Sequence, residues 1–115
     1  MGATSLLAQG NPADVGPEQA QLAQLDLSSY RIIRLSAGNW VESPAPVIIG
    51  LSHVDQPNTP NANLISGLDS FTLAPGEWVS KVYEVPGEVV ALFAEPDPPQ
   101  VGGVKVFFTV YAWTD

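Results

Sequence analysis

Catalysis needs reactive side chains that the fold can bring together, and this sequence offers few of them. Its 115 residues include one histidine, His53, and no cysteine, which excludes thiolate metal sites, cysteine nucleophiles and disulfide frameworks. His53 precedes Asp55 by two residues, but one imidazole beside one carboxylate does not make a metal centre or a catalytic base. We therefore interpret the chain as a protein that is not an enzyme, and we expect no catalytic residue, metal ion or cofactor.

Two loop sequences come closest to known binding motifs. Oxygen ligands suited to calcium follow His53, at Asp55, Asn58, Asn61 and Asn63. The alternating acidic spacing and the terminal glutamate of a calcium-binding loop are missing there. The pair Gly102-Gly103 precedes an expected strand rather than a helix, so it does not predict a phosphate-binding loop.

The aromatic residues are more informative than the titratable ones. Trp40, Trp78 and Trp113 stand beside polar or charged neighbours at the ends of expected strands. Tryptophans in such positions either close the two ends of a small sandwich or form an exposed platform for a sugar ring or another subunit. The sequence leaves both interpretations open.

The last segment of the chain alternates with a period of two, which is typical of a β-strand. One set of its side chains is apolar and predicts a core face: Val104, Val106, Phe108, Val110 and Ala112. The other set is amphipathic and aromatic: Lys105, Phe107, Thr109, Tyr111 and Trp113. A row of this second kind is unusual on an open surface, so we expect another molecule to cover it.

The same period, with β-branched and aromatic residues, continues from residue 29 to the end of the chain. It predicts seven strands, near residues 29–36, 39–42, 46–54, 64–73, 77–85, 88–94 and 103–113. Ala74-Pro75-Gly76-Glu77 and Val85-Pro86-Gly87-Glu88 predict type II turns on both sides of one strand, in a meander. We therefore predict an all-β fold, a small antiparallel β-sandwich or jelly-roll-like barrel of about seven strands.

The first 28 residues differ in composition from the rest. Residues 1–27 contain no cation, no aromatic residue and no β-branched run, so we divide the chain into an N-terminal arm, 1–28, and a β-sandwich domain, 29–115. Residues 17–25 begin with proline and an acid and continue with good helix formers, which suits a short helix. The arm is either a disordered tail or a segment that becomes ordered on a neighbouring subunit.

The charge of the chain limits its partners. The formal net charge is −8, and the four cations are scattered: Arg31, Arg34, Lys81 and Lys105. This balance disfavours nucleic acid and anionic membranes as partners. The sequence also lacks the roughly 18 consecutive apolar residues of a membrane-spanning helix.

The layout of the chain resembles that of the capsid decoration (cement) proteins of tailed bacteriophages. The shared features are a short acidic β domain without cysteine, an N-terminal arm, Pro-Gly turns and an aromatic last strand. The resemblance implies a jelly-roll-like or related fold, with dimers or trimers seated on the major capsid protein at the virion surface, where they bridge and stabilise neighbouring subunits. It also implies that the arm reaches toward a neighbour.

We expect a homo-oligomer, because a small domain with an aromatic outer face gains free energy when that face is covered. The residues expected at the interface are Leu22, Leu25, Trp40, Trp78, Phe107, Tyr111 and Trp113. The alternative function is an extracellular carbohydrate-binding or adhesive β-sandwich module, in which Trp40, Trp78 or Trp113 stacks on sugar rings.

Overall fold

The computed structural model describes residues 5–55, 64–84 and 89–114, and within these ranges the chain forms β-strands and no helix. The strands are β1 (Ser5–Val15), β2 (Ala20–Asp26), β3 (Ile32–Asn39), β4 (Val47–Val54), β5 (Leu64–Leu73), β6 (Trp78–Glu84), β7 (Val89–Pro96) and β8 (Val104–Trp113). The described ranges therefore contain no helix that could span a membrane.

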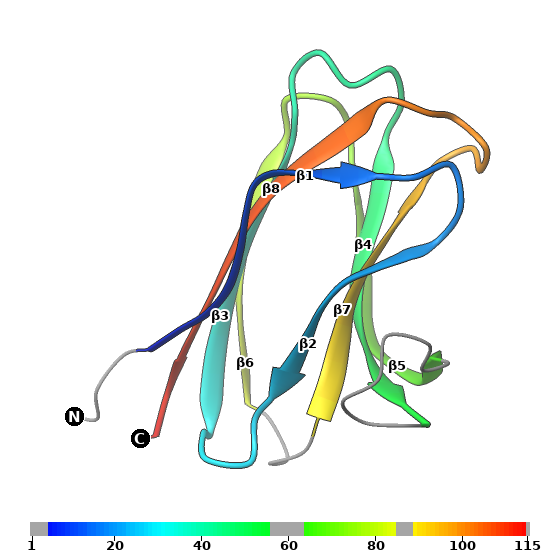
Figure 1. Cartoon of the computed structure of the whole chain (residues 1–115). Helices are drawn as coiled ribbons and strands as arrows, with labels where there is room; N and C mark the ends of the chain where they lie inside the picture. Colours follow the sequence, from blue (N-terminus) through cyan, green and yellow to red (C-terminus); the bar gives the residue numbers. More distant parts are fainter. Residues whose placement is uncertain (1–4, 56–63, 85–88, 115) are drawn as a thin grey trace.

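The eight strands form two antiparallel sheets that face each other (Figure 1). The strand order is β1-β8-β3-β6 in the first sheet and β2-β7-β4-β5 in the second. The prediction of an all-β antiparallel sandwich is confirmed. The predicted meander is wrong, because β6 lies in the first sheet while β5 and β7 lie in the second.

The core lies between the two sheets and is almost entirely aliphatic. The predicted core face of β8 is confirmed, since all five of its side chains are buried: Val104, Val106, Phe108, Val110 and Ala112. Opposite them the second sheet contributes buried residues from β4 and β7: Val47, Ile49, Leu51, Val90, Leu92 and Ala94. Burial of these side chains is the main source of stability, as expected for a chain without disulfides.

One buried polar side chain holds the end of the sandwich where β3 ends. Asn39 is 1% exposed, and its Nδ2 donates hydrogen bonds to the carbonyl oxygens of Ala45 and Leu73, both at 3.0 Å. It thereby connects β3, in the first sheet, to the loop before β4 and to the end of β5, in the second.

Residues 5–26 do not form an arm outside the sandwich, and that prediction is wrong. β1 pairs with β8 and β2 pairs with β7, so this segment supplies one edge strand to each sheet. β1 was not recognised in the sequence, because the pairing of β1 with β8 has two register shifts, which break the period of two. The helix suggested for residues 17–25 is wrong as well, since pairing with β7 overrides the helix propensity of β2.

The turns agree in part with the sequence. The turn at residues 74–77 is confirmed: Glu77 N–H donates to the Ala74 carbonyl at 2.9 Å and Gly76 has a φ of 87°. The turn predicted at residues 85–88 lies outside the described residues. The strand predicted at 39–42 is wrong, because the chain turns there, with Ser43 N–H donating to the Trp40 carbonyl at 3.0 Å.

Candidate interaction face

The outer face of the first sheet carries exposed apolar side chains on three of its strands, β1, β8 and β6, aligned with Arg34 of β3. Cross-strand register places Val82 of β6 beside Arg34 of β3, Arg34 beside Tyr111 of β8, and Tyr111 beside Leu6 of β1. Val82 is 58% exposed, Leu6 46% and Tyr111 40%. We call these three residues, with Arg34 between them, the apolar row.

A groove lies further along the same face, toward the end of β3. It has a volume of about 270 Å³ and is lined by Gln9, Gly10, Asn11, Ser36, Trp78, Phe107, Phe108 and Thr109. The rings of Trp78 and Phe107 stack, with centroids 5.7 Å apart and an interplanar angle of 29°. We call this depression the aromatic groove.

Glycine allows an aromatic ring to lie close to the backbone of the groove. A Cβ at Gly38 would overlap the indole of Trp78, its cross-strand neighbour on β6, so the indole occupies the space that a side chain would fill. Gly10 plays the same part on the inner face, where a Cβ would collide with the buried ring of Phe108.

The charge of the first sheet is opposite to that of the whole chain. Its four strands contain two acidic residues, Asp14 and Glu84, and three cations, Arg34, Lys81 and Lys105, which gives +1 in a chain of net charge −8. Lys105 lies 3.7 Å from Asp14 and 5.3 Å from the ring centroid of Trp40. Lys81 faces inward, toward Asp69 of β5 in the other sheet, so the outer face itself carries Arg34 and Lys105 against Asp14 and Glu84 and is neutral.

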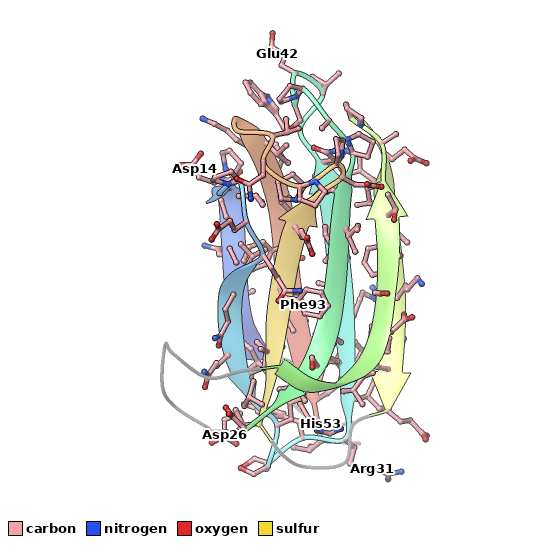
Figure 2. All side chains as sticks on the ribbon, turned by 90° about the vertical axis from the view of Figure 1, so that its right-hand side faces the viewer. Asp14, Asp26, Arg31, Glu42, His53 and Phe93 are labelled. Carbon is pink, nitrogen blue, oxygen red and sulfur yellow. The ribbon has the colours of Figure 1, made fainter. Side chains whose placement is uncertain are left out.

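Acidic residues are found at the two ends of the sandwich. Figure 2 shows Asp14 and Glu42 at one end, and Asp26 with His53 and Arg31 at the other. Asp26 accepts hydrogen bonds from the backbone N–H and the hydroxyl of Ser28, which lower the pKa of its carboxyl group. Because its two acids are balanced by two cations, the outer face of the first sheet repels acidic partners less than the rest of the surface does.

A polar cluster joins the two sheets at the edge formed by β5 and β6. Asp69 accepts a hydrogen bond from the Tyr83 hydroxyl at 2.7 Å and lies 3.3 Å from Lys81 Nζ. The hydrogen bond from Tyr83 is the main cause that lowers the pKa of Asp69, while burial and the neighbouring Asp69 raise the pKa of Tyr83. The Lys81 ammonium also lies 4.7 Å from the ring centroid of Phe71. These side-chain contacts connect β5 and β6, the edge strands of the two sheets, which are not paired with each other.

The structure brings together some of the residues predicted at an interface and separates others. Trp78 and Phe107 meet in the aromatic groove, and Tyr111 lies in the apolar row. Trp113 is partly buried beside Ile32 at the end of β8, and Trp40 lies on the turn after β3.

Leu22 and Leu25 were expected at an interface, on an N-terminal arm outside the sandwich, but the structure places them within the sandwich. Both lie on β2: Leu25 is 1% exposed in the core and Leu22 packs against the core. Their apolar side chains stabilise the sandwich itself. Leu6, Arg34 and Val82 were not among the residues predicted at an interface. The alternation of β6 marked Val82 as outward-facing, but no pattern within one strand indicated that it joins a row.

The candidate metal ligands do not form a recognisable site in the part of the chain that is described. No group of three or more histidine, aspartate or glutamate side chains comes close enough there to hold a metal ion. His53 is partly buried on β4. Asn58, Asn61 and Asn63, considered as calcium ligands, lie outside the described residues.

Comparisons with known proteins place the chain by fold. No protein-family model and no curated protein matches its sequence. A solved chain from "Bacillus endospore appendages form a novel family of disulfide-linked pili" is similar with a TM-score of 0.64 and 10% identity, over 99% of this chain and 87% of that one. A chain from the "acidic stable capsid structure of Helicobacter pylori bacteriophage KHP30" is similar with a TM-score of 0.57 and 15% identity, over 100% and 92%.

A further likeness is more distant. The xylan-binding domain CBM22-1 of Paenibacillus barcinonensis Xyn10C gives a TM-score of 0.47 at 11% identity, over 100% of this chain and 85% of that one, which is too low to support an argument. The two higher scores show a shared fold at low sequence identity. The described residues therefore form an antiparallel β-sandwich of eight strands, similar in fold to the pilus chain and the phage capsid chain.

Proposed function

We propose that this chain is a structural subunit of an extracellular or virion-exposed protein assembly, in the role of a capsid decoration protein. In this proposal the apolar row contacts neighbouring protein subunits, either other copies of the chain or the major capsid protein. The observation that carries the proposal is the alignment of three exposed apolar residues with Arg34 on the outer face of one sheet: Leu6 on β1, Tyr111 on β8 and Val82 on β6.

An aligned set of exposed apolar residues differs from scattered ones. Single exposed hydrophobic residues are ordinary on protein surfaces, whereas contiguous ones mark interaction sites. The row also contains Tyr111 and Arg34, and tyrosine and arginine are enriched among the residues that contribute most to protein–protein binding. A flat sheet face with this composition suits contact with another protein surface.

The charge distribution supports the same face. A chain of net charge −8 repels other copies of itself and other acidic surfaces. On the outer face of the first sheet Arg34 and Lys105 balance Asp14 and Glu84, so contact through this neutral face avoids most of that repulsion. The contact therefore weakens less at low salt than a contact through the acidic ends would.

The similar solved structures are compatible with a structural role, but they do not assign one to this chain. The pilus and the phage capsid named above are both surface assemblies, but at 10% and 15% identity the likeness shows only the fold. The proposal accordingly depends on the apolar row. If the row is the contact, a substitution there must affect association more than an equivalent substitution on the second sheet.

Val82→Glu tests the proposal, with Leu68→Glu as the matched control. Both residues are exposed aliphatic side chains, 58% and 41%, but Leu68 lies on β5 in the second sheet. The assay is sedimentation of each purified variant alone and with particles from the organism or virus that encodes the chain. We expect the wild type and Leu68→Glu to associate, and Val82→Glu to bind at least about tenfold more weakly because its carboxylate loses water in the contact. A monomeric wild type that also fails to bind particles refutes the proposal, as does full association of Val82→Glu.

A further inference from the structure

We propose that the aromatic groove binds a neutral carbohydrate, with one sugar ring lying against Trp78. This inference goes beyond the proposed function, because it assigns a ligand to a part of the face that the apolar row does not use. Cross-strand register separates the two: Trp78 and Phe107 flank Gly38, whereas Val82 and Tyr111 flank Arg34, four residues earlier on β3.

Trp78 offers an aromatic surface that is already in place. The residue is 63% exposed, which is high for a tryptophan in a strand. Its indole packs directly over the backbone of Gly38, which has no side chain in the way. The ring of Phe107 stacks against it, with the two centroids 5.7 Å apart. A ring fixed in this way loses little conformational entropy when a ligand stacks on it.

A sugar ring matches the electrostatics of such a surface. The face of an indole is electron-rich and attracts the weakly positive C–H groups that line one side of a pyranose. The apolar contact also removes the exposed part of Trp78 from water. An aromatic residue exposed on a sheet therefore favours a ligand with one flat C–H face and polar edges.

The remaining side chains of the groove supply hydrogen bonds in both directions. Gln9 and Asn11 each carry an amide that donates and accepts, and Ser36 and Thr109 each carry a hydroxyl that does the same. Sugar hydroxyls likewise donate and accept. Four such side chains, from β1, β3 and β8, line the groove beside the stacking surface on β6.

The charge and size of the groove narrow the class of ligand. None of its lining residues is ionisable under ordinary conditions, so it offers no cation for a phosphate, a nucleotide or an acidic sugar. Its volume of about 270 Å³ is slightly below the roughly 300 Å³ at which pockets for drug-sized ligands begin. The groove thus suits one or two neutral sugar units of a longer glycan.

Isothermal titration calorimetry with neutral oligosaccharides tests the inference. The probes are maltohexaose, cellohexaose, xylohexaose and chitohexaose, after a screen on an array that also contains acidic glycans. We expect at least one neutral glycan to bind with a Kd of about 1 mM or tighter, with quenching of tryptophan fluorescence. Trp78→Ala is expected to weaken this binding at least tenfold, and Gln9→Ala about two- to tenfold, the effect of one neutral hydrogen bond.

The matched control for Trp78→Ala is Phe93→Ala. Phe93 lies at the centre of the outer face of the second sheet, over Gly50, in an arrangement similar to that of Trp78 over Gly38 (Figure 2). Phe93→Ala should leave glycan binding unchanged, and circular dichroism shows whether each variant keeps its β structure. Absence of binding to every neutral glycan, preference for acidic glycans, or unchanged binding by folded Trp78→Ala overturns the inference.

Val82→Glu separates this inference from the proposed function. The variant should keep its affinity for the glycan while it loses subunit association, and Trp78→Ala should do the reverse. Loss of glycan binding in Val82→Glu together with normal binding in Trp78→Ala would place the ligand on the apolar row and would refute the assignment to the groove.

Discussion

Replacement of Asn39 by alanine tests how the two sheets are held together at one end of the sandwich. The change removes two hydrogen bonds from Nδ2, to the carbonyl oxygens of Ala45 and Leu73, in a site that is 1% exposed. Each bond contributes about 1 kcal/mol, and a buried carbonyl left without its donor costs a further 1–3 kcal/mol or so. We therefore expect Asn39→Ala to reduce the free energy of unfolding by about 3 kcal/mol, a large part of the 5–15 kcal/mol typical of a domain.

Urea denaturation followed by circular dichroism measures this loss. With an m-value of about 1.5 kcal/mol per molar urea, a loss of about 3 kcal/mol moves the midpoint down by about 2 M. Ser36→Ala is the control, because its hydroxyl makes a hydrogen bond with Ser80 on the outer face and its removal should cost under about 0.5 kcal/mol. A shift below about 0.5 M for Asn39→Ala would show that Asn39 does not hold the two sheets together.

Three further predictions concern the sheet edge and the groove. The hydrogen bond from Tyr83 lowers the folded-state pKa of Asp69, so the ionised Asp69 stabilises the fold. This stabilisation is complete above the ordinary aspartate pKa of about 4. It is lost as the pH falls through the lower folded-state pKa of Asp69. Asp69→Asn should therefore lower the urea midpoint at pH 7 and have less effect at about pH 2; an equal effect at both values contradicts this. Tyr83→Phe should reduce the same pH dependence, which is measured as the urea midpoint at a series of pH values. An unchanged dependence would mean that Lys81, and not Tyr83, lowers the pKa of Asp69. Gly38→Ala should displace the Trp78 indole, shift its fluorescence and destabilise the fold by about 1–3 kcal/mol through overpacking; unchanged fluorescence and stability would mean that the indole does not occupy that space.

The sequence predicted the strands whose alternation is regular. The strand from 64 to 73 and the core face of β8 were read directly from the period of two, and the turn at 74–77 from its Pro-Gly pair. In β8 one side of the strand is buried along its whole length, so the pattern in the chain matches the pattern of burial.

The first two strands escaped prediction for a physical reason. β1 contains Gly10 and Pro12, residues depleted in strands, and its pairing with β8 shifts register twice. β2 consists of alanine, glutamine, leucine and aspartate, which have low strand propensity, and its conformation depends on pairing with β7. Local propensity gives no indication of such tertiary pairing.

The interaction face was predicted only in part. Phe107 and Tyr111 were predicted on the outer side of the last strand, while Trp78 was left open between a sandwich end and an exposed platform. The row also needs Leu6 and Val82. These residues are far apart in sequence and become neighbours only through the order β1-β8-β3-β6. Strand order depends on contacts between distant segments, and a single sequence does not reveal it.

Hydroxyl-radical footprinting of the chain in its native assembly tests the central claim most directly. The side chains of Leu6, Val82 and Tyr111 should react several-fold more slowly in the assembly than in the dissociated chain, because a neighbouring protein covers them. Leu68, of similar exposure on the other sheet, should react equally in both states. Protection of Leu68 with full reactivity of Val82 and Tyr111 would show that the chain meets its neighbours through a different surface.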